Sequence, residues 1–142
     1  MFSSVRKAVD VYAQVGVETG VAAADPHKLI LMLFDGTHAA ICAARLAISR
    51  NDIAAKAAAI SKAIAIIDGG LKASLDIKAG GVLAERLAGL YDYMLNRLLA
   101  ANLRNDTELL DEVNRLIDEL RGAWAQIGQR SGAAPASEAT AK

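Results

Sequence analysis

Apolar side chains in the middle of this sequence recur at helical spacing. From residue 25 to about residue 128 they return every three or four positions, a period typical of amphipathic helices and not of strands. Four stretches carry the pattern, at about 26–50, 51–75, 82–103 and 105–128. Because long helices joined by short connections pack antiparallel, the pattern predicts an all-α fold, an up-down four-helix bundle over residues 25–128.

Residues that cap or break helices mark the boundaries. Asp25 followed by a proline is typical of a helix start, because aspartate caps the first free N–H groups and proline tolerates the first helical position. Gly80-Gly81 predicts a turn before the third helix. Asn105 as N-cap, with Glu108 three residues later, predicts a capping box at the start of the fourth helix.

The two ends of the chain differ from the middle. Residues 1–24 are rich in valine and contain two glycines, which predicts a weakly helical arm. Val5, Val9 and Tyr12 fall on one side of such a helix and give it an apolar face. Residues 129–142 lack large apolar side chains, so we expect a disordered tail.

The first three helices carry more apolar surface than a bundle interior needs. A helix of such a bundle requires an apolar arc of about 100–150°, and the fourth helix has one stripe of that width. The second and third helices each have a core row and a second row beside it. The predicted core rows are Ile53, Ala57, Ile60, Ile64, Ile67 and Leu71, and Leu83, Leu87, Leu90, Met94 and Ala101. The second rows are Ala59, Ala63, Ile66 and Gly70, and Ala84, Ala88, Tyr91, Leu95 and Leu99.

The excess has two interpretations, which the pattern leaves open. The second rows could be buried against neighbouring helices, against the arm or in a homodimer. Alternatively, the small residues beside Tyr91 and Leu95 could form a shallow groove that takes an amphipathic helix of a partner. The predicted groove consists of Ala59, Ala63, Ile66, Tyr91, Leu95 and Leu99, with Val5, Val9 and Tyr12 as its lid.

Charge narrows the function classes. The sequence has 16 basic and 16 acidic residues and no net charge, without the basic excess of proteins that bind nucleic acid or lie on membranes. The longest stretch without a charged residue is nine residues, 36–44, whereas a membrane span needs about 20. The N-terminus lacks a signal-peptide pattern and there is one cysteine. We therefore expect a cytoplasmic protein without membrane insertion.

One face of the first helix carries side chains that could do chemistry. Asp35, His38 and Cys42 lie at i, i+3 and i+7, a spacing that could hold zinc or pair a base with a thiol. No second cysteine is present, and no nucleophile, base and oxyanion donor assemble in the sequence, so we predict no metal, no cofactor and no enzyme activity. A phosphotransfer bundle that uses His38 is an alternative, although the Lys-Gly pair typical of those sites does not follow it.

Several motifs in order resemble the bacterial flagellin export chaperones of the FliS family. The resemblance extends from Tyr12 to about Ile127. Its main motifs are Asp25-Pro26, Leu29-Ile30-Leu31-Met32-Leu33-Phe34-Asp35-Gly36, Leu90-Tyr91-Asp92-Tyr93-Met94, Arg97-Leu98, Ala101-Asn102 and Ala123-Trp124.

The resemblance implies a function without ATP. Such a chaperone binds the disordered C-terminal segment of flagellin, prevents its premature polymerisation in the cytoplasm and delivers it to the flagellar type III export gate. The N-terminal segment, to which Tyr12 belongs, would cover part of the binding surface until flagellin displaces it, and Tyr12 would also contact the export gate. A client-free structural bundle stays open as an alternative, with the protein a monomer or a homodimer.

Overall fold

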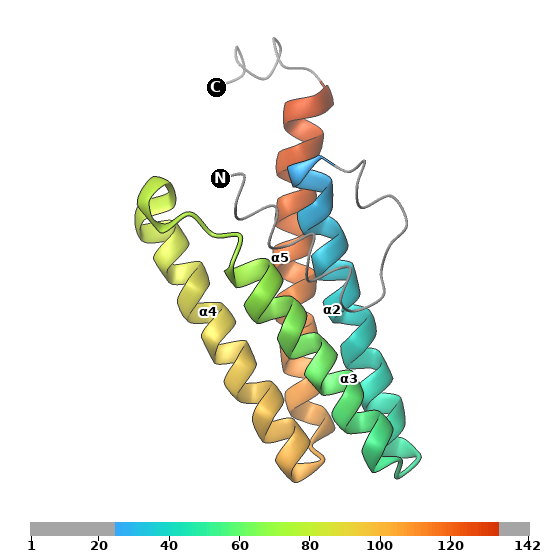
Figure 1. Cartoon of the computed structure of the whole chain (residues 1–142). Helices are drawn as coiled ribbons and strands as arrows, with labels where there is room; N and C mark the ends of the chain where they lie inside the picture. Colours follow the sequence, from blue (N-terminus) through green and yellow to red (C-terminus); the bar gives the residue numbers. More distant parts are fainter. Residues whose placement is uncertain (1–24, 134–142) are drawn as a thin grey trace.

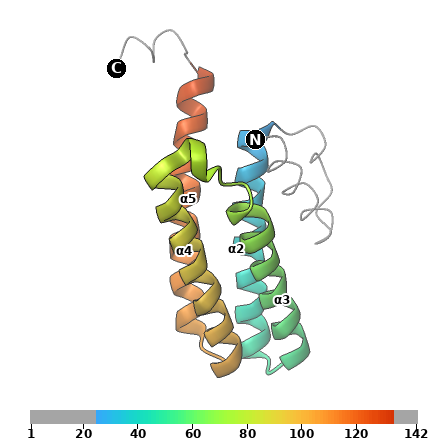
Figure 2. The ribbon, with the colours of Figure 1, turned by 60° about the vertical axis from the view of Figure 1, so that its left-hand side comes forward.

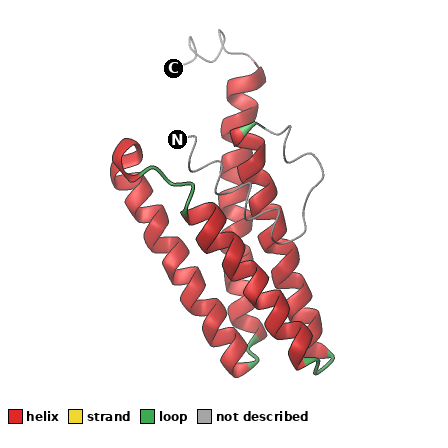
Figure 3. Cartoon of the chain, in the orientation of Figure 1, coloured by secondary structure: helices red, strands yellow, loops and turns green. Residues whose placement is uncertain are grey.

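The computed structural model describes residues 25–133, with the backbone alone for residues 129–133. The chain runs through helices α2 (Pro26–Ser49), α3 (Ile53–Ile66), α4 (Ile77–Arg104) and α5 (Thr107–Ala133). A short π-helix, η1 (Ile67–Lys72), continues α3. Within the described residues there are helices and connecting loops and no strand (Figure 3).

The helices form an antiparallel up-down bundle, as the apolar pattern predicted. Each α-helix runs opposite to the next along the chain, and α2 and α5 lie side by side to close the ring (Figures 1 and 2). Helices α2 and α3 share the most extensive contact, and the backbones of the diagonal pairs stay farther apart than those of neighbouring helices in the described part of the chain. The predicted all-α fold is confirmed.

Aspartates begin the helices. The Asp25 carboxylate accepts a hydrogen bond from the Lys28 N–H at 2.7 Å, and a proline takes the first helical position, as predicted. Asp52 and Asp76 cap α3 and α4 in the same way, through the N–H groups of Ala55 and Ala79. Each carboxylate satisfies an N–H that the helix itself leaves free.

The cap of α5 differs from the prediction by one residue. The Asp106 carboxylate accepts the N–H of Glu108 at 2.9 Å and is the cap. Asn105 instead ends α4 in the left-handed conformation, with φ 54°. Asn51 does the same between α2 and α3, with φ 57°. Asparagine tolerates this conformation better than most residues, so both lower turns use it to reverse the chain.

The predicted turn at Gly80-Gly81 is present as a break at Gly81, and the regular part of the third helix follows it, but one helical turn that the prediction missed precedes the break. Helix α4 starts at Ile77, because Asp76 already caps it. Gly81, with φ 56° and ψ −133°, breaks the regular geometry inside the helix, so the first turn lies at an angle to the rest (Figure 1). A side chain is strongly disfavoured at these angles, which explains the glycine.

Most of the excess apolar surface is buried inside one chain. The core takes residues from the second rows as well, including Ile66 and Tyr91, and from α2 it takes Phe34 and Ile41; all four are at most 4% exposed. Two predicted core residues are on the surface instead. Ile53, in the first turn of α3, is 71% exposed, and Leu83, next to the break in α4, is 67% exposed. Both belong to helix ends, where no neighbouring helix covers them.

Helix α5 is longer than predicted. It continues to Ala133, so the first five residues of the expected tail are helical. The remainder of the tail, residues 134–142, lies outside the described residues, as does the arm of residues 1–24. Near its upper end Trp124 joins α5 to α2. The Trp124 indole N–H donates to the His27 carbonyl oxygen at 2.9 Å, and the two rings stack 4.9 Å apart.

Candidate functional site

The α3 part of the predicted groove faces α2. Ala63 and Ile66 are at most 1% exposed, and Ala59 is half-buried against the core. Gly70 lies one turn beyond Ile66 on the same side, and a Cβ atom there would come within 3.1 Å of the Leu33 Cδ2 atom of α2. The small residues of this row therefore let α2 and α3 pack closely.

The α4 part of the predicted groove faces α3 and η1. Asp92, Leu95 and Leu99 lie on one side of α4, and Asp92 accepts a hydrogen bond from the Lys72 ammonium of η1 at 2.6 Å. Leu95 is half-buried and Leu99 is 57% exposed. Tyr91 lies deeper, 4% exposed, and burial raises the pKa of its phenol.

The two rows therefore do not form facing walls of one groove. The row of Ala59, Ala63 and Ile66 lies on the side of α3 that packs against α2. Leu95 and Leu99 lie on the side of α4 that faces α3 and η1. A helical-wheel projection of each sequence gives the width of its apolar arc. It does not show which side of that arc packs against which neighbouring helix. The lid residues Val5, Val9 and Tyr12 fall outside the described residues.

The structure instead shows a band of exposed apolar side chains along the α3–α4 boundary. Lys56, one turn after Ile53, reaches α4, so the row that contains both residues faces α4. Ile53, Leu99 and Leu103 are 71%, 57% and 84% exposed. We call the following set the apolar band: Ile53, Ile64, Leu95, Leu99 and Leu103. Ile64 and Leu95 are its half-buried members and pack against the core.

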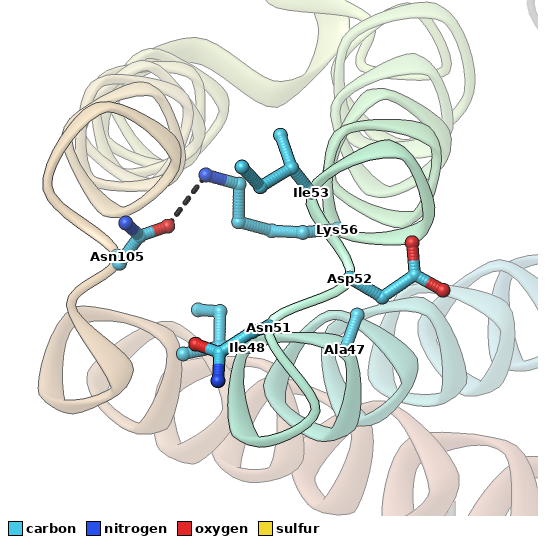
Figure 4. Close-up of a pocket in the computed structure, with 7 residues that line it drawn as sticks. All are labelled: Ala47, Ile48, Asn51, Asp52, Ile53, Lys56 and Asn105. Carbon is cyan, nitrogen blue, oxygen red and sulfur yellow. Dashed lines mark hydrogen bonds between the residues drawn. The ribbon is translucent and has the colours of Figure 1, made fainter.

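A buried lysine closes the lower end of this boundary. Lys56 is 7% exposed, and its ammonium donates to the Asn102 carbonyl oxygen at 2.9 Å and to the Asn105 Oδ1 atom at 2.5 Å. Figure 4 shows it crossing from α3 toward Asn105, with Ile53 beside it. The Lys56 and Asn105 side chains help line a pocket between the two lower turns, which is open to solvent. The lysine satisfies one carbonyl oxygen near the end of α4, that of Asn102, which the helix leaves free.

The face with Asp35, His38 and Cys42 pairs with α5. The Arg121 Nε atom lies 2.5 Å from Asp35, and the Asp118 Oδ1 atom lies 3.0 Å from the His38 Nδ1 atom. The Asn114 amide donates to the Cys42 sulfur at 3.6 Å. Arg45 and Asp111 form a further pair between the same two helices, with the Arg45 Nε atom 3.3 Å from the Asp111 Oδ1 atom. These side chains thus join two helices, and no group of three possible metal ligands occurs among the described residues.

A second polar cluster joins α4 to α5. The Tyr93 hydroxyl and the Arg97 guanidinium both donate to the Glu112 carboxylate, the latter at 2.8 Å. The Arg97 guanidinium also lies over the Tyr93 ring, 5.3 Å from its centre. The hydrogen bond from Tyr93, followed by that from Arg97, lowers the pKa of Glu112.

Replacing Glu112 with glutamine should reduce the loss of stability in acid. Because the folded state lowers the pKa of Glu112, its contribution is present above the unfolded carboxyl pKa of about 4.3 and is lost as the pH falls below it. The pair is largely solvent-screened, so we expect at most about 1 kcal/mol. Urea unfolding from pH 6 to pH 3 measures it. Glu119→Gln, an exposed carboxylate on the same helix, is the control, and equal slopes for both variants would contradict the prediction.

Helix α2 is long and apolar enough to cross a membrane by length and composition. Its apolar residues Leu29, Leu33, Phe34 and Ile41 form part of the bundle core, each at most 3% exposed. A core helix satisfies the same criterion, and the packing of α2 is that of a core helix.

Comparison with known proteins identifies the family. The family model described as flagellar protein FliS matches residues 8–131. The flagellar secretion chaperone FliS of Salmonella typhimurium is 51% identical over 123 residues, which are 87% of this chain and 91% of that protein. FliSB of Pseudomonas aeruginosa is 47% identical over 85% of this chain and 95% of that protein. FliS of Bacillus subtilis is 34% identical over 79% and 82%. The chain therefore belongs to the FliS family of flagellar proteins.

Proposed function

We propose that the protein is a cytoplasmic chaperone of flagellar type III export whose client is the C-terminal segment of flagellin. The observation that carries the proposal is the family: the relatives that match most of the chain are named flagellar secretion chaperones. The resemblance of the sequence motifs supports flagellin as the client. The proposed role is binding, with no chemical step and no cofactor.

The apolar band supports a binding role on physical grounds. A disordered segment forms helices only when it has an apolar surface on which to bury one face. Ile53, Leu99 and Leu103 together provide such a surface without an opposing element among the described residues. The neutral composition of the chain fits recognition by apolar burial with little electrostatic steering.

The predicted groove residues take different parts in this proposal. Leu95 and Leu99, in the apolar band, are directly accessible to a client helix, and Ala59 is partly so. Ala63, Ile66 and Tyr91 are core residues here, so a client would reach them only if the helices separated. Val5, Val9 and Tyr12 remain the proposed lid, which flagellin would displace. Sequestering the client prevents polymerisation until delivery to the export gate.

Calorimetry with flagellin segments tests the proposal. Titration of the full chain with the C-terminal segment of a flagellin should give a complex with a dissociation constant of about 1 μM or tighter. Circular dichroism should show a gain of helix on mixing, and the heat-capacity change should be negative because apolar surface is buried. The N-terminal segment of the same flagellin is the control. No heat and no gain of helix with the C-terminal segment would refute flagellin as client.

Light scattering distinguishes the client-free alternative. A structural homodimer would bury the apolar band against a second copy, and the chain alone would then elute with twice its mass. The chaperone proposal expects the mass of the complex with flagellin to exceed that of the chain alone. A stable dimer that does not dissociate on addition of the flagellin segment would favour the alternative.

A further inference from the structure

Two lysines connect α3 and η1 to α4, one at each end of their boundary. At the lower end, the buried Lys56 ammonium binds the Asn102 carbonyl oxygen and the Asn105 side chain. At the upper end, the Lys72 ammonium lies 2.6 Å from the Asp92 carboxylate, with the two side chains 35% and 53% exposed. These are the polar side-chain contacts recorded between α4 and the α3–η1 element in the described residues.

The boundary between the lysines is apolar. Ile60 and Ile64 on α3, and Tyr91 and Leu95 on α4, carry no charge and lie near the core. Helix α4 has less contact with α3 than with α5, and η1 adds further contact with α4 at the upper end. Apolar surfaces can separate without leaving unpaired charges, provided that another apolar surface replaces the lost contact.

The other boundaries have contacts distributed along their length. Four polar side-chain pairs join α2 to α5, from Asp35–Arg121 to Arg45–Asp111, and the His27–Trp124 stack lies beyond the first of them. The Tyr93–Glu112–Arg97 cluster joins α4 to α5. Close packing of Gly70 against Leu33 joins α3 to α2. The α3–α4 boundary differs in that its polar side-chain contacts, among the described residues, lie only at its two ends.

The two lysines are not equivalent. Lys56 is buried and binds two oxygens of one turn, so breaking its contacts would leave buried polar groups unpaired. Lys72 and Asp92 form an exposed ion pair, a type that contributes little to stability and is weakened by salt. The chain near Lys72 also has the features that permit a local change of backbone: the π-helix with Gly69-Gly70, the connection of residues 73–76 and the break at Gly81.

We propose that the α3–α4 boundary opens at its upper end to admit a client helix to Tyr91, with the Lys72–Asp92 pair as the latch and the Lys56 contacts as the hinge. This rests on the proposed function, since it explains how a client reaches a residue that is 4% exposed. The latch is weak enough for a client that buries apolar surface in the opening to displace it. The hinge keeps α4 attached to α3 while the upper end is apart.

Charge reversal at the latch tests the proposal. Lys72→Glu and Asp92→Lys each place like charges together, and the double variant restores an ion pair with its direction reversed. Hydrogen exchange of the intact chain should be about two- to five-fold faster in η1 and residues 82–95 of either single variant, the range expected for loss of a surface ion pair. Exchange in α2 and α5 should not change. Lys78→Glu, an exposed lysine in the first turn of α4, is the charge-matched control.

Two results would overturn the proposal. Single variants that exchange like the wild type, or a double variant that does not return to wild-type exchange, would show that the pair is not a latch, whatever the client is.

Association with a fluorescent flagellin C-terminal segment should accelerate by a similar factor in the single variants. Faster exchange with unchanged association would show that the client does not enter at this boundary. If wild type binds no flagellin segment, the proposed function fails, while the exchange results still decide whether the pair is a latch.

Discussion

Replacing Ile66 with aspartate should unfold the protein. The Ile66 side chain is 1% exposed and belongs to the core. Aspartate at this position would lose the apolar contacts of isoleucine. It would also bury a carboxylate among the apolar side chains of the core. We expect a loss of about 4–5 kcal/mol, which equals most of the stability of a marginal domain. Loss of the cooperative thermal transition by circular dichroism at 222 nm is the measurement.

Ile66→Val is the control for this experiment. It removes one methylene group without a charge and should cost about 0.5–1.5 kcal/mol, so it remains folded with a lower midpoint. If Ile66→Asp keeps native helical content and a cooperative transition, Ile66 lies on an accessible surface. That outcome would restore the interpretation in which Ile66 forms a wall of an open groove.

The burial of Ile66 also shows which features of the fold the apolar pattern of the sequence could predict and which it could not. The pattern predicted the number of helices, their antiparallel order and the wide apolar arcs. It could not show that the edge with Ala63 and Ile66 faces α2, while the edge with Leu95 and Leu99 faces α3. That distinction depends on how each helix is rotated in the bundle, which arises from contacts between distant parts of the chain. An excess of apolar surface therefore proved to be mostly core.

Helix ends were the second source of error. Ile53 fits the apolar row of its helix by spacing, but it lies in the first turn, where α4 does not cover it. Asn105 is a good capping residue by type, yet the next residue, Asp106, caps α5 and leaves Asn105 to reverse the chain. Both errors concern one turn of helix, where local propensity and tertiary contacts compete.

A buried lysine was missed for a different reason. Lys56 lies at helical spacing from Ile60 and Ala63, so its place in an apolar row was visible in the sequence. A lysine at such a position is usually assigned to the surface, because its charge is costly to bury. Here the carbonyl oxygen of Asn102 and the side chain of Asn105 offset that cost. Since both acceptors come from the far end of α4, sequence spacing alone could not reveal them.

Replacing Leu99 with aspartate should weaken client binding and leave the fold intact. Leu99 is 57% exposed, so its change should alter the free energy of unfolding by no more than about 0.5 kcal/mol. A carboxylate in the middle of the apolar band would be buried under a docked client helix without a partner. We expect at least about a tenfold loss of affinity for the flagellin C-terminal segment, or about 1.4 kcal/mol, by calorimetry.

Ile127→Asp separates this effect from a general loss of apolar surface. Ile127 is 52% exposed, close to the value for Leu99, but it lies on α5 near the other end of the bundle. The Ile127→Asp variant should therefore bind the flagellin segment with wild-type affinity. Equal affinity losses in the two variants would show that the client does not select the apolar band. Wild-type affinity in Leu99→Asp would place the client on another face, because a carboxylate cannot lie unpaired beneath an apolar helix without cost.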